Sequence, residues 1–140
     1  MTVENALVAA VKAAAGNVPV YDSIVQHAPE VVVPRYVVVY PSVGETLEPA
    51  ICELGRRDRT WAPRLTFLVA GRNLALGPEV RALADRVLNA LTVQRLSLAG
   101  WSAGPIEVDF VNPPQRDESV LAAPTVYLTA GVKISATSAA

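Results

Sequence analysis

The sequence has few ionisable residues and little thiol or metal-binding chemistry. Charged residues make up 18% of the 140 residues, the formal net charge is -1, and there is one cysteine and one histidine. Cys52 therefore has no intrachain disulfide partner, and one cysteine with one histidine cannot form a structural zinc site. The balanced charge argues against nucleic-acid binding, because neutralising phosphates requires an excess of lysine and arginine.

Long hydrophobic runs are also lacking. Residues 1–15 have neither the basic flank nor the leucine-rich block of a signal peptide, and no stretch is long enough to span a bilayer. We therefore expect a soluble protein that is not exported and has no membrane partner. Hydrophobic residues nevertheless make up 51% of the chain, which argues against disorder and leaves apolar surface that a partner could cover.

Two segments have the spacing of amphipathic helices. In residues 3–14 apolar side chains recur three and four residues apart, Thr2 is placed to cap the first turn, and Gly16 ends the pattern. The second helix is expected over residues 78–91, with Gly77 at its cap. Its apolar stripe predicts docking on a sheet. The stripe consists of Val80, Leu83, Ala84, Val87, Leu88 and Leu91.

Four segments are predicted as strands because they are rich in β-branched and aromatic residues or alternate in polarity. The first is apolar on both faces, so either a second layer or a neighbouring subunit should cover the face turned away from the core. In the third, alternation places Ile106, Val108 and Phe110 on one face and Glu107 on the other. The segments are Arg35–Tyr40, Arg64–Ala70, 106–111 and 125–134.

The order of these elements is helix, strands, helix, strands, which predicts one layered α+β domain over residues 1–140. Residues 41–62 show no sustained period and are predicted to be a long loop, of the kind that is usually functional or mobile. Residues 112–118 are predicted to be a rigid polar loop. The small residues 136–140 are expected to form a flexible tail.

No constellation of residues indicates catalysis. His27 lies in a turn-like context, and no nucleophile elbow is encoded that would let it activate Cys52 or a serine. Glu107 and Asp109 could divide acid and base roles on one strand face, although an exposed strand face explains the pair more simply. No glycine-rich loop has the spacing that cradles phosphate. We expect neither enzymatic activity nor a cofactor.

A cluster of arginines followed by a tryptophan lies within the predicted long loop. Three interpretations fit this composition: a solvated loop, a protein interface in which arginine and tryptophan act as anchors, and a nucleic-acid surface. The first two have more weight because of the balanced net charge. The candidate interface residues are Arg56, Arg57, Arg59, Trp61 and, from the second predicted loop, Arg116.

Several segments taken in order form a recognisable series that covers nearly the whole chain. They are the N-terminal Ala/Val helix, Val20-Tyr21-Asp22, the strand from Pro34 to Tyr40 with its glycine-containing loop, the strand Arg64–Ala70, the helix 78–91 and the closing strand 127–134. This series resembles the tail terminator (tail completion) proteins of siphophages, which are long-tailed bacteriophages. The family has no catalytic signature, so the resemblance rests on length and element order.

The resemblance implies a mixed, mainly antiparallel sheet flanked by two helices, assembled as a homo-oligomeric ring, usually a hexameric one. Such a ring sits on the last ring of the major tail tube protein, stops tube polymerisation and presents a surface to the head-tail connector protein. DNA would only pass through its lumen. The expected place is the virion tail, after assembly in the host cytoplasm.

The sequence leaves the orientation of the ring open. From loop length alone, we expect contacts with the tube or with neighbouring subunits at residues 41–61 and 112–123. The sequence does not decide whether Arg56, Arg57 and Arg59 face the lumen. Two alternatives remain: another head-tail neck protein, such as a head-closure or adaptor subunit, and a small cytoplasmic enzyme or ligand-binding domain that uses the cleft between sheet and helices.

Overall fold

The long C-terminal strand β9 (Thr125–Ser138) is the centre of the fold, because other strands pair with it along both of its edges. The structure is a computed structural model that describes residues 3–23, 35–40, 45–51, 57–71, 76–92, 94–97, 100–116 and 124–138. The helices of this part are α1 (Val3–Ala15) and α2 (Leu76–Leu91). The remaining strands are β1 (Val20–Asp22), β2 (Arg35–Tyr40), β3 (Glu45–Ile51), β4 (Arg57–Trp61), β5 (Arg64–Ala70), β6 (Trp101–Ala103), β7 (Glu107–Val111) and β8 (Gln115–Arg116).

The sheet is mixed and mainly antiparallel, as the resemblance to tail terminator proteins implies. Strands β4 and β5 pair with one edge of β9 in a single continuous register, and Pro63 between them accepts a hydrogen bond from the N–H of Val132 (3.1 Å). Strands β6, β7 and β8 pair with the other edge. Beyond β5 the sheet continues with β2 and then β1, and the β1–β2 pair is parallel.

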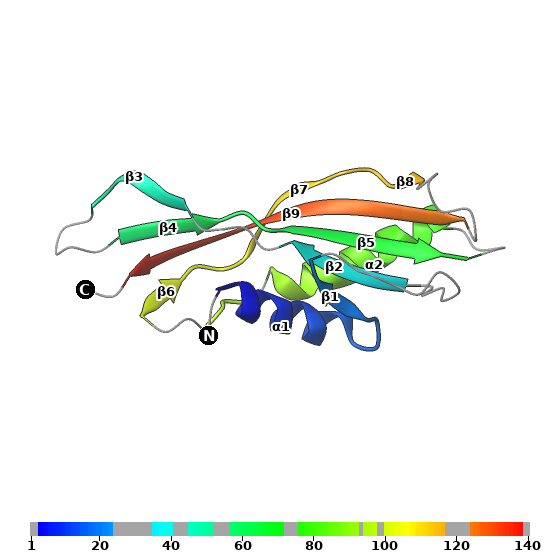
Figure 1. Cartoon of the computed structure of the whole chain (residues 1–140), viewed down its shortest axis with the longest axis horizontal. Coiled ribbons are helices and arrows are strands. Elements are labelled where there is room, and N and C mark those ends of the chain that lie inside the picture. The colour runs from blue at the N-terminus through cyan, green and yellow to red at the C-terminus, as the bar shows by residue number, and fades with distance from the viewer. Residues whose placement is uncertain are drawn as a thin grey trace.

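The two helices pack on one face of the sheet. Helix α2 contacts β5 and β9, and α1 contacts α2 and β1 (Figure 1). The molecule is elongated along β9, and β3, β4, β6 and the end of β9 extend away from α2 at one end (Figure 1). The described part of the chain is thus a two-layer body with a β extension.

The core between these layers follows the predicted alternation. The buried residues of α2 are the six that form its predicted stripe. On β5 the buried positions Leu65, Phe67 and Val69 alternate with half-buried or exposed ones. Val37 and Val39 of β2 belong to the same core. These side chains lose nearly all contact with water, which is the main stabilising term of such a fold.

The end of α1 is fixed by a glycine and by an arginine from α2. Gly16 has a φ of 65°, the left-handed conformation that commonly terminates a helix. The Arg86 guanidinium donates a hydrogen bond to the carbonyl oxygen of Ala15, the last residue of α1 (2.5 Å). A cation at this position also complements the negative end of the helix dipole. The two helices are therefore joined by a polar contact as well as by packing.

The prediction of a loop over residues 41–62 is wrong, because β3 and β4 form an antiparallel pair there. Pro49 lies within β3, and a proline is tolerated in a strand mainly at an edge, where its missing N–H costs no ladder bond. The pairing shifts register between Thr46 and Ile51, so no regular alternation is expected from the strand. The sequence signal of a strand is weak for these two reasons.

A β-bulge in β7 overturns the predicted face of Phe110. Val108 pairs with Val132, whereas Phe110 pairs with Gly131, and the register shifts between the two pairs. Directly paired residues point to the same face, and Val132 and Gly131 are neighbours that point to opposite faces. Phe110 therefore lies on the face away from the helices, where its ring covers Gly131.

This close approach predicts a large difference between two glycine substitutions. A Cβ at Gly131 would clash with three atoms of the Phe110 ring, so Gly131→Ala should lower the free energy of unfolding by about 1–3 kcal/mol. At Gly104 the nearest atom would be the Ser135 carbonyl oxygen at 3.5 Å, an ordinary contact, so Gly104→Ala is the matched control with an effect within about 0.5 kcal/mol. Urea denaturation followed by circular dichroism measures both. Equal stability of the two variants would contradict the packing of Phe110 on Gly131.

Other element boundaries differ by small amounts from the sequence prediction. Helix α2 begins at Leu76, so Gly77 lies in its first turn rather than at its cap. Strand β9 runs to Ser138, so residues 136–138 of the expected tail belong to the sheet. The short strands β1, β6 and β8 were not predicted, and β8 falls in the predicted loop 112–118. Neither described helix has the length and apolar character needed to cross a membrane.

Candidate protein interface

The face of the sheet opposite the helices, called here the outer face, carries rows of apolar and aromatic side chains. One row crosses β2, β5, β9 and β8, because Tyr36 pairs with Leu68, Leu68 with Tyr127, and Tyr127 with Gln115. Paired residues on adjacent strands lie side by side on the same face. The Tyr127 hydroxyl donates a hydrogen bond to Gln115 Oε1 at 2.7 Å, which fixes the polar end of the row.

A second row runs parallel to the first. Tyr40 pairs with Arg64, Arg64 with Gly131, and Gly131 with Phe110. The Arg64 guanidinium lies 5.9 Å from the centre of the Phe110 ring, within the range of a cation–π contact. Tyr40 at the other end of the row is 42% exposed.

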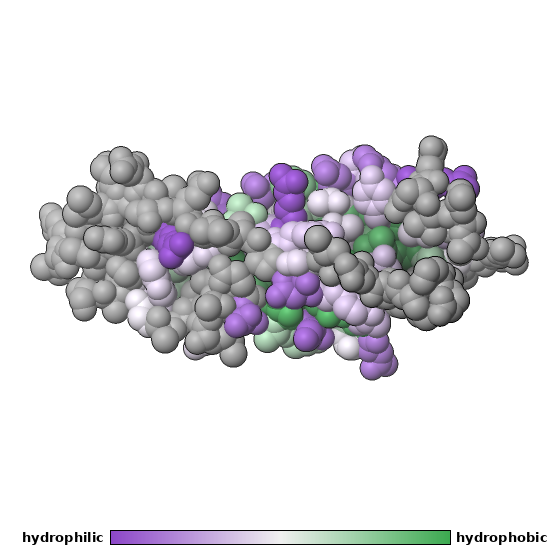
Figure 2. Space-filling view, viewed as in Figure 1, coloured by the Kyte–Doolittle hydropathy of each residue, from purple (hydrophilic) through white to green (hydrophobic). Residues whose placement is uncertain are grey.

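In the described part of the chain no helix covers the outer face. Tyr21 and Tyr36 stack edge to face there, with ring centres 5.8 Å apart. In the space-filling view hydrophobic residues reach the surface toward the right-hand part of the molecule, among hydrophilic ones (Figure 2). Tyrosine and phenylalanine with a nearby arginine are the residue types that are enriched at protein interfaces. The outer face is therefore the strongest candidate for a contact with another protein.

The structure does not bring the five predicted interface residues together. Arg59 and Trp61 lie on β4, paired with the end of β9, whereas Arg116 lies on β8, paired with Val126 at its beginning. About eight to ten strand residues separate these positions on β9, roughly 30 Å. Arg57 pairs with Ile51 in the same β extension, and Arg56 lies outside the described residues. The candidates thus form two patches at opposite ends of the sheet.

The β4 patch is a packed aromatic cluster. Trp61 is 4% exposed, belongs to the core and stacks edge to face on Trp101 at 5.7 Å. The Arg59 guanidinium lies 5.2 Å from the Trp61 ring centre. These contacts are made within the chain, so the participation of Arg59 and Trp61 in an interface stays a prediction. Arg116, by contrast, is exposed.

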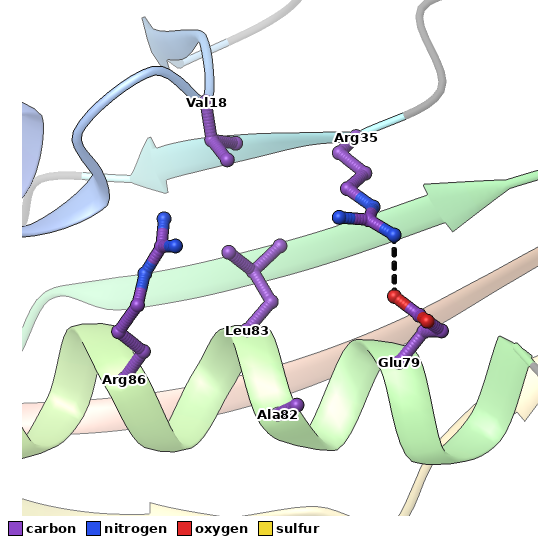
Figure 3. Close-up of a pocket in the computed structure, with 6 residues that line it drawn as sticks. All are labelled: Val18, Arg35, Glu79, Ala82, Leu83 and Arg86. Atoms are coloured by element: carbon purple, nitrogen blue, oxygen red, sulfur yellow. Dashed lines mark hydrogen bonds and ion pairs between the residues drawn. The ribbon is translucent and has the colours of Figure 1, made fainter.

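A pocket of about 170 Å³ lies between α2, the start of β2 and the segment that leads into β1. Arg35 and Glu79 form an ion pair at its rim (2.5 Å), and Arg86 stands at its other end (Figure 3). Leu83 and Val18 line the apolar part between them. Arg35 and Glu79 are 44 residues apart in sequence, so no local pattern could have indicated this pairing.

Two of the residues considered for chemistry, Glu107 and Asp109, lie within the described part of the chain. Among the residues that the structure describes, no three metal-ligating side chains come together. Glu107 and Asp109 are both exposed on β7, and Glu107 pairs in register with Lys133. His27 and Cys52 lie outside the described residues.

Comparison with known proteins identifies the fold through structure rather than sequence. No protein-family model and no curated protein matches the chain. Among solved structures, one chain of the virion of a native gene transfer agent particle is similar, with a TM-score of 0.63 and 16% sequence identity. The match covers 91% of this chain and 84% of that one. The two chains share a fold over almost their full lengths.

The sequence predicts only part of the outer face and nothing of the pocket. The apolar character of both faces of β2 predicted that something must cover the second face. The alignment of Leu68, Tyr127 and Phe110 with β2 depends on strand order and on the bulge, which the sequence does not show. Val108 and Val111 are 39% and 50% exposed because β7 is an edge strand, paired with β9 alone in the described sheet. Alternation in the sequence would place Val108 in the core.

Proposed function

We propose that the chain is a structural protein of a phage-type virion and, more specifically, a tail terminator. In this role, copies of the chain form a ring, six being the usual number, on the end of the tail tube. The ring stops polymerisation of the major tail tube protein and joins the tail to the head-tail connector. The chain works by binding other proteins and carries out no chemical reaction.

The observation that carries the proposal is the outer face. In the described part of the chain the helices lie on one side of the sheet, and the tyrosine, leucine and phenylalanine rows on the other side have half-buried and exposed apolar area that a partner can bury. Stable protein contacts use such aromatic positions as anchors. Ser102 of the β extension and both residues of β8 supply further exposed positions, and these strands lie at the two ends of the sheet (Figure 1).

The fold similarity supports the same role. The matching chain belongs to the virion of a gene transfer agent particle, and the shared fold covers 91% of the present chain. At 16% identity this similarity concerns architecture, so the tail position and the ring are part of the proposal. The resemblance to siphophage tail terminators supports the same role independently of the fold similarity, because it rests on the order of elements that the sequence predicts.

Native mass spectrometry at rising protein concentration tests ring formation. We expect a discrete oligomer, with a mass that is an integer multiple of 14.8 kDa, alongside the monomer. Negative-stain images of the same sample should show closed rings. A protein that stays monomeric and also fails to bind tail tubes would rule the proposal out. A protein that binds the head connector but never the tube would instead be another neck protein.

A further inference from the structure

Strand β7 carries both acidic and apolar side chains that are exposed to solvent. Within the described residues three large hydrophobic side chains are exposed, and two of them, Val108 and Val111, lie on β7. Between them stands Asp109, an exposed residue at the bulge. Asp109 makes no hydrogen bond or ion pair with another described residue. In the described part of the sheet β7 pairs with β9 alone, so its other edge is open.

The pocket on α2 has the complementary character. Its charged residues are two arginines and one glutamate, which leaves one positive charge in excess. Arg35 uses one nitrogen for Glu79 and Arg86 uses one for the Ala15 carbonyl, although each guanidinium has five N–H donors. Figure 3 shows a nitrogen of each guanidinium directed toward the space above Leu83. A carboxylate placed there could accept hydrogen bonds from both arginines.

We propose that the pocket of one copy of the chain receives the β7 edge of a second copy, with the Asp109 carboxylate between Arg35 and Arg86. Val108 and Val111 of the second copy then cover Leu83 and the apolar part of the pocket. The inference rests on the proposed assembly into a ring and names the contact between its subunits.

Charge and placement both favour this occupant. A carboxylate between two guanidinium groups makes charge-assisted hydrogen bonds, which are about twice as strong as neutral ones. The pocket lies beside the start of β2 and the segment that leads into β1, near one edge of the sheet. Strand β7 lies at the opposite edge, beyond β9 (Figure 1). Two different patches on one subunit make a head-to-tail contact, and such contacts generate a ring when the rotation between subunits closes.

Disulfide trapping tests the contact in the full chain. In a Cys52→Ser background, cysteines are placed at the pocket wall by Ala82→Cys and on β7 by Val108→Cys, both at exposed positions. Oxidation should give a ladder of covalent oligomers on a non-reducing gel. In the control variant Ser102→Cys, at the exposed position of β6, replaces Val108→Cys. The pocket–β7 variant should give at least about tenfold more covalent oligomer, because only the proposed contact holds its thiols within disulfide reach.

Two outcomes separate this inference from the proposed function. A discrete oligomer in native mass spectra, with rings in negative-stain images but no covalent oligomers from the variant with cysteines at Ala82 and Val108, would overturn the contact. The ring proposal would still stand. Absence of rings, of the ladder and of tube binding would overturn both. As a second measurement, Asp109→Asn should weaken self-association by about tenfold without unfolding the monomer, and the effect should shrink at high salt. Unchanged self-association of Asp109→Asn would also overturn the contact.

Discussion

Phe67→Ala is expected to lower the free energy of unfolding by about 3–5 kcal/mol, the range for truncating a buried aromatic side chain. Phe67 is 0% exposed, lies in the middle of β5 and, among the described residues, is the largest of the fully buried side chains. Its pairing partners Val37 and Leu128 are themselves buried, so the cavity cannot be filled from solvent or by a flexible neighbour. Urea or thermal denaturation followed by circular dichroism measures the loss.

The neighbouring residue provides the matched control for Phe67. Leu68 follows Phe67 on β5, points to the outer face and is only half-buried. Leu68→Ala should therefore cost about 1 kcal/mol or less. If both truncations destabilise the monomer equally, the assignment of the two faces of β5 is wrong.

If the chain has the proposed role of a tail terminator, Leu68→Glu should abolish its binding to tail-tube ends while leaving a folded monomer. The substitution places a charge in the row between Tyr36 and Tyr127, at the middle of the outer face. A carboxylate buried in an apolar contact without a partner opposes association by several kcal/mol, so affinity should fall at least about hundredfold. Cosedimentation with tubes of a major tail protein encoded beside this chain measures the loss.

A charge change on the other layer is the control for Leu68→Glu. Lys12 is exposed on α1, in the helical layer that covers the opposite face of the sheet. Lys12→Glu should leave tube binding within about twofold of the original chain, because rim or remote charges contribute little. Circular dichroism of both variants must show the spectrum of the folded chain. Full tube binding by folded Leu68→Glu would remove the outer face from the proposed interface.

Much of the fold follows from local patterns in the sequence. The α2 stripe has helical spacing and becomes the helical side of the core. The alternation over Arg64–Ala70 separates buried Phe67 from half-buried Leu68 as the period predicts. Gly16 ends α1 as predicted, because glycine readily adopts the left-handed conformation that it has there. These features depend on residues that are close in sequence.

The features that the sequence did not indicate depend on pairing between distant residues. Strands β3 and β4 form a β extension in which β3 pairs with β4 and β4 pairs with β9, although proline interrupts the pattern of β3. The bulge in β7 moves Phe110 to the outer face through its partner Gly131. The Arg35–Glu79 ion pair closes one end of the pocket across 44 residues. Each depends on strand register or helix docking, which a single sequence does not encode locally.

In the candidate interface, too, the sequence indicates the local features and misses those that depend on strand pairing. The sequence correctly indicates that β2 has an apolar second face, and it predicts arginine and tryptophan anchors in one loop with Arg116 in a second loop. In the structure, the outer-face rows combine residues from β2, β5, β9 and β7, and no segment of the chain contains a whole row. The roles of Arg56, Arg57, Arg59, Trp61 and Arg116 in an interface stay predictions.

The most direct measurement of the central claim is the length of tail tubes grown with and without this chain. Tubes of the major tail protein are polymerised alone, with the chain, and with Leu68→Glu, and are then imaged by electron microscopy. We predict shorter tubes that carry a ring at one end with the original chain, and unrestricted growth with the variant. Tubes that grow to the same length with bare ends in all three samples would contradict the account.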